Sequence, residues 1–279
     1  MRWMLFLILA LGMVVGGCGG GDKTAPDSGR GVTGKVTVMG STALLPLAKD
    51  AAIKFMEQNH GVTVNVSGGG SFTGLQQVAA GAVDIGTSDV EPPAGDPAYR
   101  ELVDHVVAVA PFLLIVHPEV GVDNLTREQA VDIFTGKIKN WREVGGKNSV
   151  ITIIHRPKSS GSRQVIKDTV LGGQEFTGDA TVMNSNGEVR QAVANTPGSI
   201  GYMDAAYLND SVKALKFNGS AYTAENVADG SYPIYSLEHM YTKGNPKGAA
   251  KAYIDFVLGA PFQADIEKMG FLPVSVLQR

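Results

Sequence analysis

The sequence contains only one cysteine, Cys18, so the chain cannot form an intramolecular disulfide. It also lacks a surplus of basic residues, because 24 Lys and Arg stand against 27 Asp and Glu and the formal net charge is −3. Nucleic-acid surfaces require clustered basic side chains, so we expect no nucleic-acid partner. An anion bound by this chain must be held by local dipoles and one or two cations rather than by the overall field.

The sequence signatures of common hydrolases and nucleotide-binding enzymes are also missing. Its histidines form no HExxH pair, and no G-x-S-x-G elbow is present. No Gly-Lys pair is followed by Ser or Thr, which excludes a P-loop. We therefore expect a protein that is not an enzyme and uses no cofactor and no metal. A phosphatase that uses His155 near Ser159 and Ser160 is the enzymatic alternative, and turnover of a chromogenic phosphate ester would reveal it.

No apolar run reaches the length of about 20 residues that a helix needs to cross a bilayer. The N-terminal run, Trp3–Val15, has 13 residues, follows Arg2 and precedes Gly16 and Gly17. This pattern predicts a signal peptide over residues 1–17. The segment ends in Val-Gly-Gly-Cys, which resembles a bacterial lipobox and implies cleavage before Cys18 and lipidation of its thiol; a plain signal peptide with an incidental cysteine is the alternative. Residues 18–33 are rich in glycine and polar residues and predict a flexible tether.

The stretch His155–Arg163, HRPKSSGSR, has the features of an anion site. A β-branched run (Val150–Ile154) predicts a buried strand before it, and residues 164–170 can form a helix after it. The turn then places Ser160, Gly161 and Ser162 at a helix start, where backbone amides lack partners and favour negative charge. Arg156 adds a planar fork suited to an oxyanion. An ordinary capped strand–helix turn is the alternative.

Two further strand–turn–helix units precede this stretch. A strand over Lys35–Met39 leads to Ser41 and Thr42, then to a helix with Pro46 in its first turn and a predicted stop at Gly61. A strand over 62–68 leads to a helix that starts near Ser71.

A third short strand, over 82–89, ends in Asp89. The long apolar runs 105–118 and 232–242 predict an extended segment that crosses between two lobes and its return. Alternating strands and helices indicate an α/β architecture with mostly parallel sheets. Ligands of such sheets bind beyond the carboxyl ends of the strands, where the hydroxyl clusters fall.

Six segments in this order resemble the phosphate-binding proteins of bacterial phosphate ABC transporters. They are GSTALLPL (40–47), GGSFTGL (69–75), DIGTSD (84–89), IFTGKIKNW (133–141), RPKSSGSR (156–163) and GSIGY (198–202). Their order and spacing match the family from about Lys35 to Val274. The resemblance implies a type II periplasmic-binding-protein fold, with two lobes joined by two crossing strands and a ligand cleft between them. The implied lobes are residues 34–112 with 235–279, and residues 113–234.

The resemblance also implies which residues hold phosphate. Carried over by position, they are Thr42, Ala43 through its amide, Ser71, Asp89, Arg156, Ser160, Gly161 and Ser162. Two positions depart from the family pattern. Lys158 stands where an acidic residue often orients the arginine, and Ser162 replaces a threonine. We expect Lys158 to point to solvent; the alternative is that it adds positive charge to the cleft.

Asp89 gives this site its expected selectivity. Phosphate near neutral pH carries at least one O–H donor, whereas sulfate carries none, and an ionised Asp accepts hydrogen bonds only. The expected ligand is therefore inorganic phosphate, delivered to ABC transporter permease subunits by an exported, lipid-anchored monomer. A carrier of sulfate, molybdate or tungstate, or a lipoprotein that scavenges or senses phosphate without transport, is the alternative.

Overall fold

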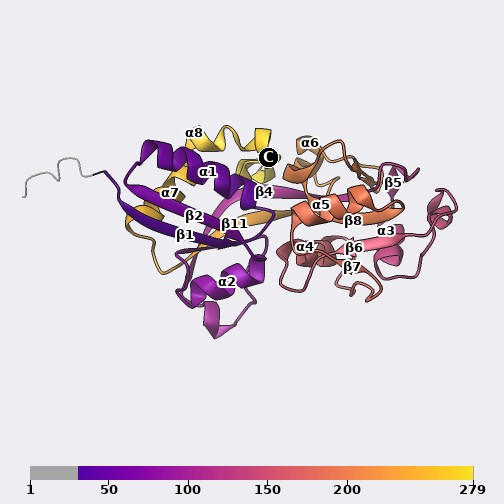
Figure 1. Cartoon of the computed structure of the whole chain (residues 1–279), viewed down its shortest axis with the longest axis horizontal. Coiled ribbons are helices and arrows are strands. Elements are labelled where there is room, and N and C mark those ends of the chain that lie inside the picture. Colours follow the sequence, from indigo (N-terminus) through magenta and orange to yellow (C-terminus); the bar gives the residue numbers. More distant parts are fainter. Residues whose placement is uncertain (1–30, 279) are drawn as a thin grey trace, which may run out of the picture. The chain divides into compact units, whose positions relative to one another are not determined.

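Two long antiparallel strands, β4 (Leu102–Val116) and β11 (Tyr235–Lys243), lie at the centre of a mixed sheet (Figure 1). The computed structural model describes residues 31–278. The predicted signal peptide, Cys18 and the tether up to residue 30 lie outside the described residues. Both predicted crossing segments are confirmed as strands, because β4 pairs with β11 on one side and with β8 on the other.

The main sheet has the strand order β2-β1-β3-β11-β4-β8-β6-β7, and β9 pairs with β4; β10 and β5 form a separate pair. The remaining strands are β1 (Gly34–Gly40), β2 (Val62–Gly68), β3 (Ile85–Ser88), β5 (Asn124–Leu125), β6 (Thr152–His155), β7 (Thr181–Val182), β8 (Ser199–Asp204), β9 (Lys213–Ala214) and β10 (Lys216–Phe217). The expectation of a mostly parallel sheet is right only at the two ends. The centre is antiparallel, because β11 runs back along β4.

The helices divide between the two ends of the sheet (Figure 1). The first lobe, with β1–β3, carries α1 (Leu45–Gln58), α2 (Ser71–Ala79), α7 (Gly248–Leu258) and α8 (Ala260–Gln263). The second lobe, with β6–β8, carries α3 (Arg127–Phe134), α4 (Gly161–Thr169), α5 (Asn186–Asn195) and α6 (Ala224–Ala228). Among residues 31–278, none of the helices is long and apolar enough to cross a membrane.

Most predicted helix starts are confirmed, and one predicted helix end is late by one residue. Pro46 lies in the first turn of α1 as predicted, α2 begins at Ser71, and α4 begins at Gly161 after the N-cap Ser160. Gly61 was expected directly after the C-cap of α1, but α1 ends at Gln58 and its C-cap is Asn59. The side-chain Nδ2 of Asn59 donates to the carbonyl of Phe55 at 2.9 Å, so an amide side chain satisfies the helix end where a glycine was expected.

The predicted strand before Arg156 begins two residues later than expected. Val150 is 69 % exposed, and β6 starts at Thr152 and continues through His155. Ile153 and Ile154 are buried as predicted. Val150 instead forms an isolated bridge with Asn140, so the sequence pattern was right about β structure but wrong about burial at its first position.

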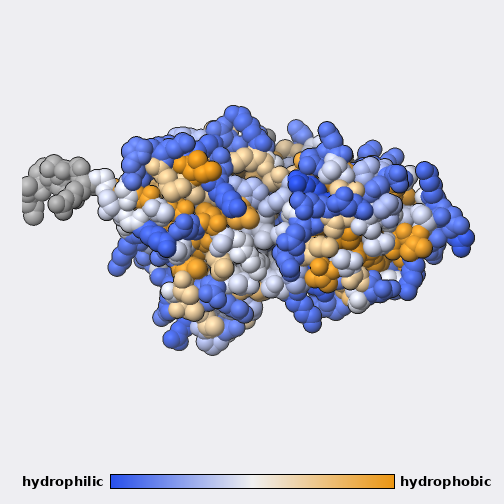
Figure 2. Space-filling view, viewed as in Figure 1, coloured by the Kyte–Doolittle hydropathy of each residue, from blue (hydrophilic) through white to orange (hydrophobic). Residues whose placement is uncertain are grey.

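One continuous core of buried apolar side chains extends through both lobes. It passes through β4, in which residues 107–116 are all buried. The large apolar side chains exposed at the surface are few and separate: Ile53, Val150, Val182, Leu208 and Leu258. In Figure 2, residues of intermediate hydropathy gather between the lobes, which distinguishes this surface from an apolar docking patch.

Asp204, the last residue of β8, is a fully buried carboxyl group. Its Oδ1 accepts from the amide of Ala206 at 2.6 Å, and its own amide donates to Oδ1 of Asn186 at 3.0 Å. Its Oδ2 has no partner in the described part of the chain. Burial raises the pKa of Asp204 well above its ordinary value, and the nearby Asp89 raises this pKa further, whereas the bond from Ala206 lowers it.

We predict that Asp204 makes the fold less stable as the pH rises. Its pKa is higher in the folded than in the unfolded chain, so its favourable contribution is complete below about pH 4 and is lost as the pH rises toward the folded pKa. Asp204→Asn keeps the acceptor for Ala206 and cannot ionise. The difference in free energy of unfolding between the variant and the natural protein should therefore shift in favour of the variant above about pH 4. The shift should be up to about 1.4 kcal/mol for each pH unit.

Denaturant titrations from about pH 4 to about pH 8 measure this difference. Asp210→Asn is the control, because Asp210 is exposed in the same lobe. A constant difference between Asp204→Asn and the natural protein over this range would contradict a raised pKa at Asp204.

Candidate anion-binding site

The turn between β6 and α4 forms one wall of the site. Arg156 directly follows β6, and α4 begins at Gly161 after the N-cap residue Ser160, whose Oγ accepts from the amide of Arg163 at 3.2 Å. Ser160, Gly161 and Ser162 are all buried. The first-turn amides of α4 have no partners within the helix, and their dipoles favour an anion at this end. The predicted strand–turn–helix unit is confirmed.

Arg156 is 1 % exposed and is only partly satisfied by the protein. Its main-chain amide donates to the hydroxyl of Tyr202 at 3.1 Å, and its Nη2 donates to the carbonyl of Asn184 at 2.9 Å. Its Nε and Nη1 are buried and have no hydrogen-bond partner in the described part of the chain. Burial lowers the pKa of Arg156, while Tyr202 and Asp89 act in the opposite direction, but an arginine keeps its proton in proteins.

Lys158 is exposed, as expected, and the structure shows what holds Arg156 without an acidic neighbour at that position. The carbonyl of Asn184 and the hydroxyl of Tyr202 fix the guanidinium and its backbone. Neither group carries a negative charge at neutral pH, so the positive charge of Arg156 is not neutralised at this point. More of its charge is therefore available to a bound anion.

The second arginine of the stretch, Arg163, does not join the site. Its Nη1 lies 3.0 Å from Nδ1 of His155, its Nη2 lies 3.3 Å from Oε2 of Glu175, and its guanidinium stacks 4.4 Å from the ring of Phe176. The same Nδ1 of His155 lies 2.9 Å from the carbonyl oxygen of Arg156, to which Nη1 of Arg163 donates at 3.3 Å. Burial lowers the pKa of His155. Arg163 therefore supports the turn that presents Arg156.

The first lobe contributes buried hydroxyl groups near the ends of β1 and β3. Thr42 is 5 % exposed, and Ser71 and Ala43 are fully buried. The Oγ of Ser71 accepts from the amide of Asp89 at 3.0 Å, which leaves its own proton free to be donated. The predicted amide donor Ala43 is already engaged, because it donates to Oγ of Ser41 at 2.9 Å.

Asp89 lies just after β3 and is 3 % exposed. Its Oδ2 accepts from Oγ of Ser162 at 2.9 Å, and its Oδ1 has no partner among residues 31–278. Burial raises the pKa of Asp89, whereas the hydroxyls of Ser41 and Ser162 and the charge of Arg156 lower it. The site therefore contains a buried acceptor in addition to the buried donors of Arg156.

Direct bonds join the two lobes around the site. Besides the bond from Ser162 to Asp89, Nδ2 of Asn186 donates to Oγ1 of Thr42 at 3.0 Å, and the hydroxyl of Tyr207 donates to the carbonyl of Thr42 at 2.6 Å. The amide of Phe72 donates to the carbonyl of Ser159 at 3.2 Å. The lobes are therefore closed on each other, and the site between them excludes bulk water.

Two glycines make this close approach of the lobes possible. A Cβ on Gly161 would overlap the side chain of Ser71, and a Cβ on Gly70 would lie 2.6 Å from the carbonyl oxygen of Ser159. Gly70 also has a φ of 95°, in the region that favours glycine. Any larger residue at either position would hold the walls of the site apart.

Of the eight predicted site residues, Thr42, Ser71, Asp89, Gly161 and Ser162 lie at the contact between the lobes, whereas the bonds of Ala43, Arg156 and Ser160 are within their own lobes. Sequence reasoning missed others, of which Asn186 is the most central. Asn186 is fully buried at the start of α5, and its Nδ2 bridges Thr42 and Ser162 at 3.0 and 3.3 Å. The run Ser185-Asn186-Gly187, with a residue of the kind that caps helices, was the available signal in the sequence. Tyr202 and Asn184 were also missed.

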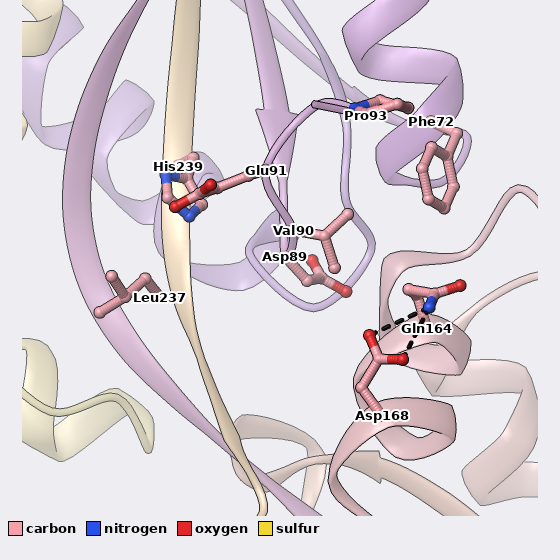
Figure 3. A pocket seen from close by; sticks show the side chains of 9 residues that line it. All are labelled: Phe72, Asp89, Val90, Glu91, Pro93, Gln164, Asp168, Leu237 and His239. Carbon is pink, nitrogen blue, oxygen red and sulfur yellow. Dashed lines mark hydrogen bonds between the residues drawn. The ribbon is translucent and has the colours of Figure 1, made fainter. Parts of the chain in front are cut away.

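A groove of about 530 Å³ opens beside the site (Figure 3). Asp89 and Val90 form its inner wall, Gln164 and Asp168 of α4 lie opposite, and His239 of β11 closes one side (Figure 3). No group of three or more His, Cys, Asp or Glu side chains is placed to hold a metal ion in the part of the chain that the structure describes. The site thus offers buried donors and one buried acceptor to a small anion.

Comparison with known proteins agrees with this geometry. The PBP superfamily domain matches residues 25–261. The phosphate-binding protein PstS of Bacillus subtilis is 42 % identical over 282 residues, covering 98 % of this chain and 93 % of that protein. PstS of Borreliella burgdorferi is 28 % identical and covers 86 % of this chain and 90 % of its own length.

Solved structures give the same result. A substrate-binding protein assigned to a phosphate ABC transporter of Clostridium perfringens, crystallised with bound phosphate, superposes with a TM-score of 0.82 at 28 % identity, covering 86 % of this chain and all of that chain. An ABC-type phosphate transport receptor of Vibrio cholerae gives a TM-score of 0.71 at 26 % identity, covering 85 % and 99 %. The chain belongs to the PstS family of phosphate-binding proteins within the PBP superfamily.

Proposed function

We propose that this protein binds inorganic phosphate between its lobes and is the substrate-binding component of a phosphate ABC transporter. One observation carries this proposal: Nε and Nη1 of Arg156 and Oδ1 of Asp89 are buried polar atoms without partners in residues 31–278. Such atoms destabilise a fold unless something pairs with them. Hydrogen phosphate supplies acceptor oxygens to Arg156 and an O–H donor to Asp89.

The combination of donors and an acceptor selects among tetrahedral anions. Sulfate and molybdate are fully ionised near neutral pH and present only acceptor oxygens. Against them the Asp89 carboxylate would face a bare oxygen, which is a repulsive and unsatisfied contact. Of phosphate, sulfate and molybdate, phosphate is the anion that meets both sides of the site, and the names of the relatives support this assignment.

Delivery to a permease follows from the same family membership and from the closed lobes. A substrate-binding protein of an importer acts outside the cytoplasmic membrane, and closure around the anion would present a distinct surface to the permease subunits. The family transports its ligand and performs no chemistry on it, so phosphatase activity is not expected. Phosphate uptake distinguishes transport from a scavenging or sensing role. Deletion of this protein should reduce uptake if a permease receives phosphate from it, and should leave uptake unchanged if the protein only scavenges or senses phosphate.

The lobes that enclose the anion are proposed as residues 34–112 with 235–279, and residues 113–234. The amide of Phe112 donates to the carbonyl of Ile234 at 2.8 Å, so the two proposed crossing points lie side by side. Bending at this pair of strands would open the cleft without breaking either lobe.

We further propose that the mature chain begins at Cys18 and is anchored by lipid on that residue. This rests on the sequence alone: an apolar run too short for a membrane span, then Val-Gly-Gly-Cys, then a polar tether up to about residue 33.

Removing the guanidinium should weaken phosphate binding strongly. Arg156→Met deletes charge-assisted hydrogen bonds that contribute about 1.5–3 kcal/mol each, so two lost bonds raise the dissociation constant by more than about a hundredfold. Arg156→Lys keeps the charge but loses the planar fork, so its dissociation constant should lie between those of the natural protein and Arg156→Met. Isothermal calorimetry measures both, with Arg142→Met, an exposed arginine of the same lobe, as the control. A dissociation constant near the natural value for Arg156→Met would remove Arg156 from contact with the anion.

Replacing the buried acceptor should narrow the preference for phosphate over sulfate. In Asp89→Asn the side chain gains N–H donors that can serve a sulfate oxygen, so the ratio of sulfate to phosphate dissociation constants should fall by about tenfold or more. Competition calorimetry gives this ratio. Asp168→Asn removes a negative charge from the same groove without touching the site, and it separates general electrostatics from proton acceptance. Unchanged selectivity in Asp89→Asn would contradict the role of Asp89.

The anchor is tested by cell fractionation. Cys18→Ser should move the protein from the membrane fraction to the soluble fraction, because the lipid supplies the membrane affinity. Gly21→Ser, in the same tether, should stay with the membranes. Retention of Cys18→Ser in the membrane fraction would mean that something other than lipid on Cys18 holds the protein.

A further inference from the structure

A second buried carboxyl group, Glu238 on the central strand β11, lies next to Asp89. Strands β11 and β3 pair at Tyr241 with Gly86, Met240 with Thr87 and His239 with Ser88. This pairing ends at Ser88, just before Asp89, and Glu238 is the residue of β11 next to His239, where the pairing of β11 with β4 shifts its register. The side chain of Glu238 lies close enough to that of Asp89 for a direct side-chain interaction, which, after burial, is one of the causes that raise the pKa of Glu238.

Glu238 is fully buried and poorly satisfied by its surroundings. Its Oε1 accepts from Oγ of Ser236 at 3.0 Å, and its Oε2 has no hydrogen-bond partner among residues 31–278. On its other side, β11 pairs it with Ala108 of β4, which offers no charge. An ionised carboxylate in this position would be buried without a cation, which is strongly unfavourable.

Three carboxyl groups share this interior: Asp89, Asp204 and Glu238. Burial raises the pKa of Glu238 well above its ordinary value, and Asp89 and Asp204 raise this pKa further, whereas the Ser236 hydroxyl lowers it. Among residues 31–278, the buried cation whose charge acts on Asp89 is Arg156. The guanidinium of Arg163 is paired with Glu175, and the ring of His239 is paired with Asp104, so neither compensates Glu238.

If one of these two neighbouring carboxyl groups is protonated, the surroundings favour the proton on Glu238 and the negative charge on Asp89. The hydroxyl of Ser162 donates to Asp89, and those of Ser41 and Ser71 and the charge of Arg156 also favour its ionised form. Glu238 receives a single hydroxyl bond. An ionised carboxylate has about four acceptor positions, so Asp89 can accept from Ser162, from Glu238 and from a ligand at the same time.

We propose that Glu238 is a positioning residue of the anion site, a neutral carboxylic acid that donates its proton to the Asp89 carboxylate and keeps Asp89 ionised. This inference rests on the proposed function, because its consequence is that Asp89 remains able to accept the O–H of phosphate. A protonated Asp89 would instead donate a hydrogen bond, and the site would then accommodate sulfate. Glu238 therefore determines specificity without touching the anion.

The test compares Glu238→Gln with Glu238→Met. Glutamine keeps a donor toward Asp89 and cannot ionise, whereas methionine fills similar space with no donor. Phosphate and sulfate dissociation constants are measured by calorimetry from about pH 5 to about pH 8. We expect Glu238→Gln to retain phosphate affinity within about threefold and to retain selectivity. In Glu238→Met the Asp89 pKa should rise, so selectivity for phosphate should fall by about tenfold or more toward the acidic end of the range.

Glu91→Gln is the control, because Glu91 is an exposed carboxylate of the neighbouring groove and should change neither property. Infrared spectroscopy provides a second readout that does not require Glu238→Met to fold. The carbonyl band of a protonated carboxylic acid should be present in the natural protein at neutral pH, and the part of it due to Glu238 should disappear in Glu238→Gln.

The possible outcomes separate the two proposals. Tighter phosphate binding by Glu238→Gln, by more than about tenfold, would mean that Glu238 carries a charge, and it would overturn the inference. Unchanged selectivity in a folded Glu238→Met, or no loss of the carboxylic acid band in Glu238→Gln, would also overturn it. Failure of the natural protein to bind phosphate in the same titrations would instead refute the proposed function, while the infrared band would still decide the protonation of Glu238.

Discussion

The site depends on one constraint: an arginine and a carboxylate are buried together with fewer hydrogen-bond partners than they need. Arg156 has two donor nitrogens and Asp89 one acceptor oxygen without partners among the described residues. The protein does not join these two charges in an ion pair. It holds them from opposite lobes through neutral groups, namely the Asn184 carbonyl for Arg156 and the Ser162 hydroxyl for Asp89. Each charge therefore keeps part of its capacity for an anion that carries both acceptors and a proton.

The local elements that carry these residues could be predicted from sequence because they depend on short-range patterns. The strands before Ser41, Ser71 and Arg156, and the helix starts that follow them, agree with the structure within a few residues. The errors have local physical causes. A side-chain amide of Asn59 ends α1 where a glycine was expected, and Val150 lies outside the buried part of its strand.

The partners of the site could not be predicted in the same way, because they come from distant parts of the chain. Asn184 and Tyr202 reach Arg156 from 28 and 46 positions away, and Asn186 reaches Thr42 across 144 positions. Glu238 becomes a neighbour of Asp89 only through the return of β11 beside β3. The engagement of the Ala43 amide by Ser41 is a further detail that a family resemblance did not supply.

The continuous core that runs through β4 has a consequence for how the protein loses its structure. The lobes share one set of buried apolar side chains and pair directly where the chain crosses, at Phe112 and Ile234. Neither lobe can melt without exposing part of the core of the other, so heating should give a single cooperative transition and not two. An anion held at the contact between the lobes then stabilises the whole described fold. Its affinity can therefore be measured from the shift of a single melting temperature.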